Sequence, residues 1–248
     1  MNTYTAVVSI HPEKHLAEAA FYLHSSLTPG SIRLTPASIE HLCTQYQQIV
    51  LLMPATTNDA FQQGSQNSRE AFLLELFQQF ADIHRTTLKI SKDRNAPSVA
   101  ADGCVTSVQT WYEKHGADVN TIAESYFWFL PAWTKKWVRV KRDMNQMTIS
   151  AAGLPLLQLQ KEKKQLPTTI SSWKITGGLL TSKRKPAVGR LWFMKSKLRS
   201  GLCYAALTHY EPSVPAVFYK WTQAPLHKLV MHQFALYRYR LSRRSRQS

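Results

Sequence analysis

Two acidic residues and a lysine in the second half of the chain follow the order that metal-dependent nucleases use. Asp143 is followed further along by Glu162-Lys163-Lys164. In such enzymes two carboxylates hold a divalent ion, and the lysine helps to position the attacking water. Short patterns of this kind arise easily by chance, and Glu162 lies in a lysine-rich segment that we expect to form a turn. A metal-dependent nuclease is one alternative function, and enzyme status stays open.

Other patterns for catalysis or cofactor binding are incomplete. His11 and His15 are four residues apart, with Glu18 one turn further on, but His11 precedes Pro12 and no third metal ligand is evident. The turn after the first predicted strand has no glycine that would let a pyrophosphate approach, and no G-x-S-x-G elbow occurs. We therefore expect no cofactor and no metal, and the sequence names no catalytic residue.

Charge is distributed very unevenly along the chain. The formal net charge is +16, yet residues 1–124 hold 8 lysines and arginines against 12 acidic residues, whereas residues 125–248 hold 23 against 3. Six of the seven tryptophans also lie in the second half. A compact half-chain with such an excess of one sign repels itself, which favours a polyanionic partner.

Basic clusters with aromatic neighbours favour nucleic acid as that partner. Lysine and arginine neutralise phosphates without reading sequence, and tryptophan or tyrosine can stack on unpaired bases. The sequence thus predicts binding of RNA or DNA. A further expectation is that the protein belongs to a larger ribonucleoprotein or DNA complex. The residues that we expect to make these contacts are Lys135, Lys136, Arg139, Lys141, Lys183, Arg184, Lys185 and Arg190.

Two alternatives use other residues of the second half. A sheet that grips a C-terminal helix could enclose a hydrophobic small molecule, fixed by polar side chains. The expected pocket residues are His209, Tyr210, Tyr219, Gln223 and His227. An anionic membrane surface could instead attract Lys135 and Lys136 and an aromatic patch. That patch would consist of Phe127, Trp128, Phe129, Trp133 and Trp137.

The hydrophobic pattern predicts an α+β protein with two regions. Residues 1–124 alternate between short apolar runs, such as Ile49–Met53, and helical spacings, such as the one that follows Ser68, which favours an α/β scaffold. Residues 125–248 show short strand patterns at regular spacing, which favours an antiparallel meander. An apolar stripe at helical spacing runs from Leu226 to Leu241, so we expect a C-terminal helix, and Pro225 either kinks this helical segment or begins a new turn.

Four short segments carry a resemblance. They are W-K-I-T-G-G-L-L from Trp173, G-R-L-W-F from Gly189, H-Y-E-P-S-V-P from His209 and Y-K-W-T-Q-A-P-L-H-K-L-V-M from Tyr219. Residues 173–234 thereby resemble an uncharacterised bacterial family of Bacillus-like genomes. The resemblance implies a sheet followed by a C-terminal helix and transfers no catalytic residue.

The cysteines and the start of the sequence favour the cytoplasm. Cys43, Cys104 and Cys203 are odd in number and widely spaced, which does not fit a disulfide framework. Residues 1–4 lack the basic stretch that precedes the apolar core of a signal peptide. No apolar run approaches the roughly 20 residues of a membrane-spanning helix.

Overall fold

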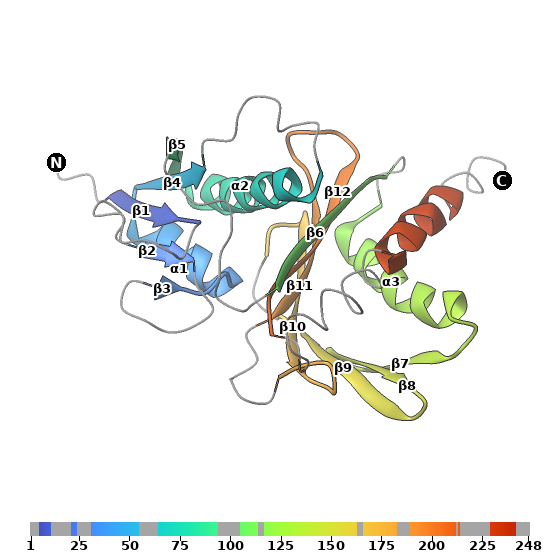
Figure 1. The fold of residues 1–248 in the computed structure, drawn as a ribbon. Coiled ribbons are helices and arrows are strands. Elements are labelled where there is room, and N and C mark those ends of the chain that lie inside the picture. Colours follow the sequence, from blue (N-terminus) through green and yellow to red (C-terminus); the bar gives the residue numbers. More distant parts are fainter. Residues whose placement is uncertain are drawn as a thin grey trace. The chain divides into compact units, whose positions relative to one another are not determined.

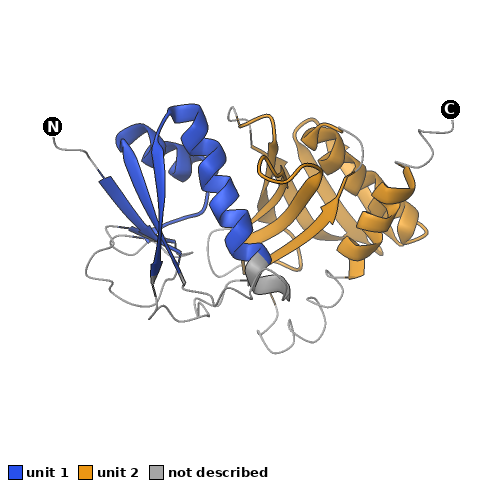
Figure 2. Cartoon of the chain, turned by 90° about the horizontal axis from the view of Figure 1, so that it is seen from above, with its two compact units in different colours: residues 1–104 blue, residues 105–248 orange. Residues whose placement is uncertain are grey.

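The computed structural model describes residues 5–10, 21–23, 31–54, 64–93, 105–113, 117–162, 166–182, 189–211, 213 and 229–241. The chain divides into two compact units, unit 1 from Met1 to Cys104 and unit 2 from Val105 to Ser248 (Figure 2). This division falls earlier than residue 124, where the charge changes sign, because residue 124 lies inside a helix of unit 2. The chain is α+β, as the sequence predicts.

Unit 1 is built on a parallel sheet with the strand order β3-β2-β1-β4-β5 (Figure 1). Its strands are β1 (Thr5–Ser9), β2 (Phe21–Leu23), β3 (Ser31–Ile32), β4 (Gln48–Pro54) and β5 (Thr87–Asp93). Ala6, Val8, Ile49 and Leu51 on the adjacent strands β1 and β4 are fully buried, which is typical of the centre of a parallel sheet. The α/β scaffold expected for this region is therefore present.

Two described helices accompany this sheet. In α1 (Pro36–Gln45), the hydroxyl of Thr35 accepts a hydrogen bond of 3.0 Å from the amide of Ser38, and Pro36 occupies the first turn. In α2 (Gly64–His84), Phe72 and Phe77 are fully buried. The helix predicted after Ser68 thus exists and begins earlier.

Unit 2 is built on an antiparallel sheet with the strand order β6-β12-β11-β10-β9-β8-β7. Its strands are β6 (Val105–Tyr112), β7 (Val138–Asp143), β8 (Gln146–Ala151), β9 (Leu154–Lys161), β10 (Ile170–Gly177), β11 (Arg190–Lys195) and β12 (Leu202–Tyr210). From β7 to β12 each strand pairs with the next one, which confirms the predicted meander. The first strand, β6, then pairs with the last, so β7 is left at one edge.

Two helices of unit 2 lie on the same side of this sheet, α3 (Val119–Trp133) and the C-terminal helix of residues 229–241 (Figure 1). Asp118 caps α3, because its carboxylate accepts hydrogen bonds from the amides of Asn120 and Thr121. Phe234 of the C-terminal helix is fully buried against Tyr126 of α3, with ring centroids 5.3 Å apart. The core of unit 2 therefore lies between the sheet and both helices.

The sheet also includes a tight hairpin between β8 and β9. Ala152 and Gly153 both have positive φ, 49° and 80°, as two-residue turns of the mirror-image type require. Nothing lies within 4 Å of a Cβ built on Gly153, so backbone conformation alone favours glycine there. None of the helices in the described ranges combines the length and apolar character needed to cross a membrane.

Candidate functional site

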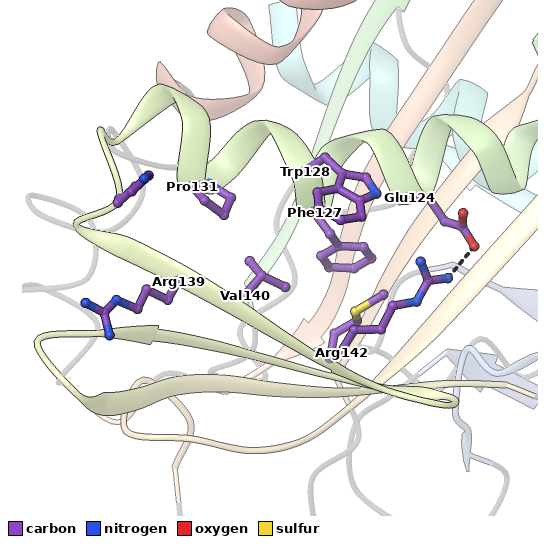
Figure 3. Close-up of a pocket in the computed structure, with 9 residues that line it drawn as sticks. Glu124, Phe127, Trp128, Pro131, Arg139, Val140 and Arg142 are labelled. Carbon is purple, nitrogen blue, oxygen red and sulfur yellow. Dashed lines mark hydrogen bonds and ion pairs between the residues drawn. The ribbon is translucent and has the colours of Figure 1, made fainter.

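One face of α3 forms the roof of a pocket in unit 2. Glu124, Phe127, Trp128 and Pro131 follow the spacing i, i+3, i+4, i+7, which brings side chains to the same side of a helix. Phe127 is buried, whereas Trp128 leaves 69% of its surface exposed. The roof thus has a buried inner part and a solvent-facing rim. Figure 3 shows Phe127 between α3 and β7.

The edge strand β7 and its neighbour β8 form the floor. Val140 and Arg142 are two residues apart on β7, so both side chains leave the same face of the sheet. Met147 of β8 pairs with Arg142 in the register and is buried. The cavity between roof and floor measures about 480 Å³, within the usual range for small-molecule sites. Lys136 and Arg139 complete its lining.

An ion pair joins roof and floor. Nη2 of Arg142 donates to Oε1 of Glu124 over 2.7 Å (Figure 3). Their side chains remain 47% and 37% exposed, so solvent screens the attraction and we expect the pair itself to contribute less than about 1 kcal/mol. Because the pair is weak, a competing anion can replace Glu124 at little cost.

The turn between α3 and β7 places the first two expected cations. The amide of Lys136 donates to the carbonyl of Pro131 over 2.8 Å, and that of Lys135 to Ala132 over 3.4 Å. These two bonds define a Schellman motif, in which glycine usually follows the helix. Here Lys135 and Lys136 adopt φ values of 50° and 67°, so two bulky residues occupy the left-handed region.

The lining combines apolar surface with an excess of positive charge. Phe127, Val140 and Met147 contribute apolar atoms, and the lining set holds three cations, Lys136, Arg139 and Arg142, against the one carboxylate of Glu124. Phe127 in turn packs edge-to-face on Trp173, with ring centroids 4.9 Å apart, so its position is fixed by the core. Such a site suits an anionic group attached to an apolar body.

Of the eight cations expected to contact nucleic acid, four are described and exposed. Lys135, Lys136, Arg139 and Lys141 lie on β7 and on the turn before it, and within the described ranges their side chains have no hydrogen-bond or ion-pair partner. Lys141 points away from the face that carries Val140, as strand alternation requires, whereas Arg139, near the start of β7, still lines the cavity under α3. The segment 183–185, with three further expected cations, lies outside the described residues.

The expectation for Arg190 is wrong. Arg190 is buried, and its Nε and Nη2 both donate to Oε1 of Glu162 over 3.1 Å. The other oxygen of Glu162 accepts from the hydroxyl of Ser172 over 2.7 Å. Arg190 opens β11 inside the sheet, where an unpaired charge is costly, so a carboxylate neutralises it. It is therefore not available to an external phosphate.

The same contacts bear on the nuclease pattern. The carboxylate of Glu162 accepts hydrogen bonds from Arg190 and Ser172. Asp143 is exposed at the end of β7. In the part of the chain that the structure describes, no three His, Cys, Asp or Glu side chains are grouped as metal ligands. Lys163 and Lys164 lie outside the described residues.

Two of the five expected pocket residues are described, and neither lines the cavity under α3. The Tyr210 hydroxyl donates to the carbonyl of Leu180, and its ring belongs to the core of unit 2. His209 is buried with a φ of 49°, where the pairing of β12 with β6 shifts register. Tyr219, Gln223 and His227 lie outside the described residues.

The aromatic patch expected for membrane contact divides in two. Phe127 and Phe129 are buried, so that part of the expectation is wrong; Trp133 is half-buried, and Trp128 and Trp137 are exposed. The reason is that residues 127–133 belong to α3, and a helix buries one side of such a run and exposes the other, whereas Trp137 lies in the turn after α3.

Sequence reasoning missed part of the pocket because it missed α3. Glu124, Pro131, Arg142 and Met147 were not candidates, although they line the cavity. Two signals could have found the helix: Asp118 as an N-cap and the buried positions Val119, Ile122, Ala123, Tyr126, Phe127 and Leu130 at helical spacing. The position of an edge strand under that helix has no local signal.

No protein-family model matches the sequence, and no curated protein matches it. The resemblance of residues 173–234 to a bacterial family therefore stays a prediction.

Proposed function

We propose that unit 2 binds a small organic anion with an apolar body in the pocket between α3 and β7. The observation that carries this proposal is the composition of the cavity, in which Lys136, Arg139 and Arg142 surround an apolar floor. Pockets that select small molecules are usually mostly apolar, with a few polar groups that fix orientation. A carboxylate, sulfonate or phosphate near the cations and a hydrocarbon or ring on Val140 and Met147 would match both parts.

The carboxylate of Glu124 competes with a ligand anion for the guanidinium of Arg142. A ligand anion would take the place of the Glu124 carboxylate on the guanidinium, and two donors of one guanidinium match a planar carboxylate well. Trp128 at the rim can cover the apolar body of the ligand, because its ring is largely exposed in the free protein. Among the residues that line the cavity, only Glu124 is acidic, and we propose binding without a reaction.

The test is a titration of the full chain with dodecanoate and with dodecan-1-ol, which share the alkyl body and differ in the anionic group. Dodecanoate should bind more tightly, and the fluorescence of Trp128 should shift to the blue as the ring is covered. Arg142→Gln should weaken dodecanoate binding about tenfold or more, because a charge-assisted hydrogen bond contributes about 1.5–3 kcal/mol. Glu124→Gln should strengthen it, because the competing charge is gone.

Lys141→Gln is the matched control, since Lys141 neighbours Arg142 on the same strand and points to the opposite face. It removes the same charge from unit 2 and should leave the affinity almost unchanged. Equal affinity for the acid and the alcohol would contradict the proposal. So would an Arg142→Gln variant that behaves like Lys141→Gln.

Binding of RNA or DNA stays a prediction that rests on the charge of the second half and on the exposure of Lys135, Lys136, Arg139 and Lys141. A cytoplasmic location also stays a prediction, and it fits the finding that Cys43 and Cys203 are free thiols.

A further inference from the structure

Three large apolar side chains are exposed at one end of the sheet of unit 2. Trp137 is 79% exposed, Leu154 56% and Leu179 45%. They come from three places in the fold: the turn before β7, the first residue of β9 and the segment after β10. Exposed apolar residues that occur singly need no explanation, but a group gathered at one place marks an interaction surface. We refer to these three residues as the apolar end.

Strand register places the three residues at the same end of neighbouring strands. Val138, which follows Trp137, pairs with Ala151, and Ala151 pairs with Leu154 across the hairpin. The amide of Leu179 donates to the carbonyl of Pro155 over 2.9 Å, so the third residue lies beside the second. The hairpin is a two-residue turn with both residues at positive φ, which holds Leu154 in a fixed position.

Positive charge borders the apolar end. Lys135 and Lys136 directly precede Trp137, and Arg139 follows it by two residues; all three side chains are exposed. Among the described acids, Glu211 is joined to the segment after β10, because its carbonyl accepts a hydrogen bond from the amide of Ser182. Asp143, by contrast, lies at the opposite end of β7.

We propose that the apolar end docks on a membrane surface that contains anionic lipid. Tryptophan prefers the headgroup region of a bilayer, and basic residues gain about 1 kcal/mol each beside acidic headgroups. Trp137 and Leu154 enter the interface, while Lys135, Lys136 and Arg139 contact the lipid phosphates and carboxylates. This is peripheral contact and needs no spanning segment.

The exposed side chains of Leu154 and Leu179 favour lipid over nucleic acid as the partner of this surface. A single-stranded nucleic acid would use the cations and could stack a base on Trp137, but it would leave Leu154 and Leu179 in water. A bilayer interface takes up all three apolar side chains as well as the cations. Trp137, Leu154, Leu179 and Lys135 do not line the pocket, so variants of these four residues test the inference separately from the pocket, whereas Lys136 and Arg139 border both surfaces.

The experiment is flotation of the full chain with vesicles of phosphatidylcholine alone and of phosphatidylcholine mixed with phosphatidylserine. Only the mixed vesicles should carry the protein, and Trp137 fluorescence should shift to the blue. Trp137→Ala and Leu154→Ser should each lower the partition coefficient, the first roughly tenfold, in line with the loss of a buried aromatic side chain. Lys135→Gln and Lys136→Gln should each lower it about fivefold.

Leu198→Ser is the matched control. Leu198 is 66% exposed and stands between Lys197 and Arg199 in the turn from β11 to β12, at the opposite end of the sheet. This variant should bind mixed vesicles as the wild type does. Equal flotation with neutral vesicles, or a loss in Leu198→Ser as large as in Trp137→Ala, would overturn the inference. So would binding of a single-stranded RNA that requires Lys135 and Lys136 in a protein that does not float.

Discussion

The guanidinium of Arg238 meets the carboxylate of Glu113 through two hydrogen bonds of 3.0 Å, from Nε to Oε2 and from Nη2 to Oε1. Glu113 directly follows β6, whereas Arg238 belongs to the C-terminal helix, and both side chains are almost fully buried. Nη1 of Arg238 also donates to Oγ of Ser125 on α3 over 3.3 Å. One ion pair thus connects an outer strand of the sheet with both helices that cover it.

We expect Glu113→Gln to destabilise unit 2 by about 3–5 kcal/mol, because it leaves a buried guanidinium without its counter-charge. Arg238→Met should lower the stability of unit 2 by a similar amount, because it leaves the buried carboxylate of Glu113 without its counter-charge. The double variant Glu113→Gln/Arg238→Met should cost less than the sum of the two, since neither buried charge then remains. Urea unfolding followed by tryptophan fluorescence measures unit 2 alone, because all seven tryptophans lie within residues 105–248. Additive costs in the double variant would contradict the pairing.

Lys135 offers a test of backbone strain at the end of α3. Lys135→Gly should raise the stability of unit 2 by up to about 1 kcal/mol, because glycine adopts the φ of 50° without a clash of Cβ. Lys135→Val should lower it, because a β-branched residue fits this region poorly. Both variants remove the same charge, so thermal unfolding of the pair separates strain from electrostatics. Equal melting temperatures of the two variants would contradict the Schellman geometry.

Local patterns predicted the strands of unit 2 well, because short apolar segments such as residues 191–194 within β11 carry their own signal. The pairing of β6 with β12 had no such signal, because most of the sequence of unit 2 lies between these two strands. The same limit explains the error at Arg190. Its neighbours in the sequence are basic or apolar, and its partner Glu162 is 28 residues away.

The candidate site was only partly predictable for a related reason. Lys136 and Arg139 are conspicuous because basic residues cluster around them. Arg142 was part of the same run, but only its register against Met147 and its contact with Glu124 distinguish it from Lys141. The composition of this site depends on which face of β7 packs toward α3. Local sequence patterns do not predict where a helix packs over an edge strand, because that packing is tertiary structure.

Cys203 predicts how unit 2 responds to alkaline pH. Burial, with a further contribution from the nearby charge of Glu113, raises the pKa of this thiol from 9.0 to about 12. In the unfolded chain the thiol releases its proton near pH 9, whereas the folded state still holds it. The contribution of the thiol to stability is therefore complete below pH 9 and is lost as the pH rises toward 12, by up to about 1.4 kcal/mol per pH unit.

Cys203→Ala removes this titration. Between pH 9 and 10.5 the free energy of unfolding of the wild type should fall more steeply than that of the variant, as measured by urea unfolding at each pH. Cys43→Ala is the matched control: burial raises the pKa of that thiol to about 12 as well, but Cys43 belongs to unit 1, which has no tryptophan. Parallel pH profiles of the wild type and Cys203→Ala would show that the thiol is accessible to water.

Phe234 tests how the C-terminal helix is held. Its ring is fully buried and meets Trp111 of β6 edge-to-face at 5.6 Å, and Tyr126 of α3 at 5.3 Å between centroids. Phe234→Ala should cost about 3–5 kcal/mol, the usual range for an aromatic side chain deleted from a packed core. Leu236→Ala, on the same helix but 37% exposed, should cost clearly less and controls for helix propensity. If the two variants unfold at the same urea concentration, Phe234 does not attach this helix to the core.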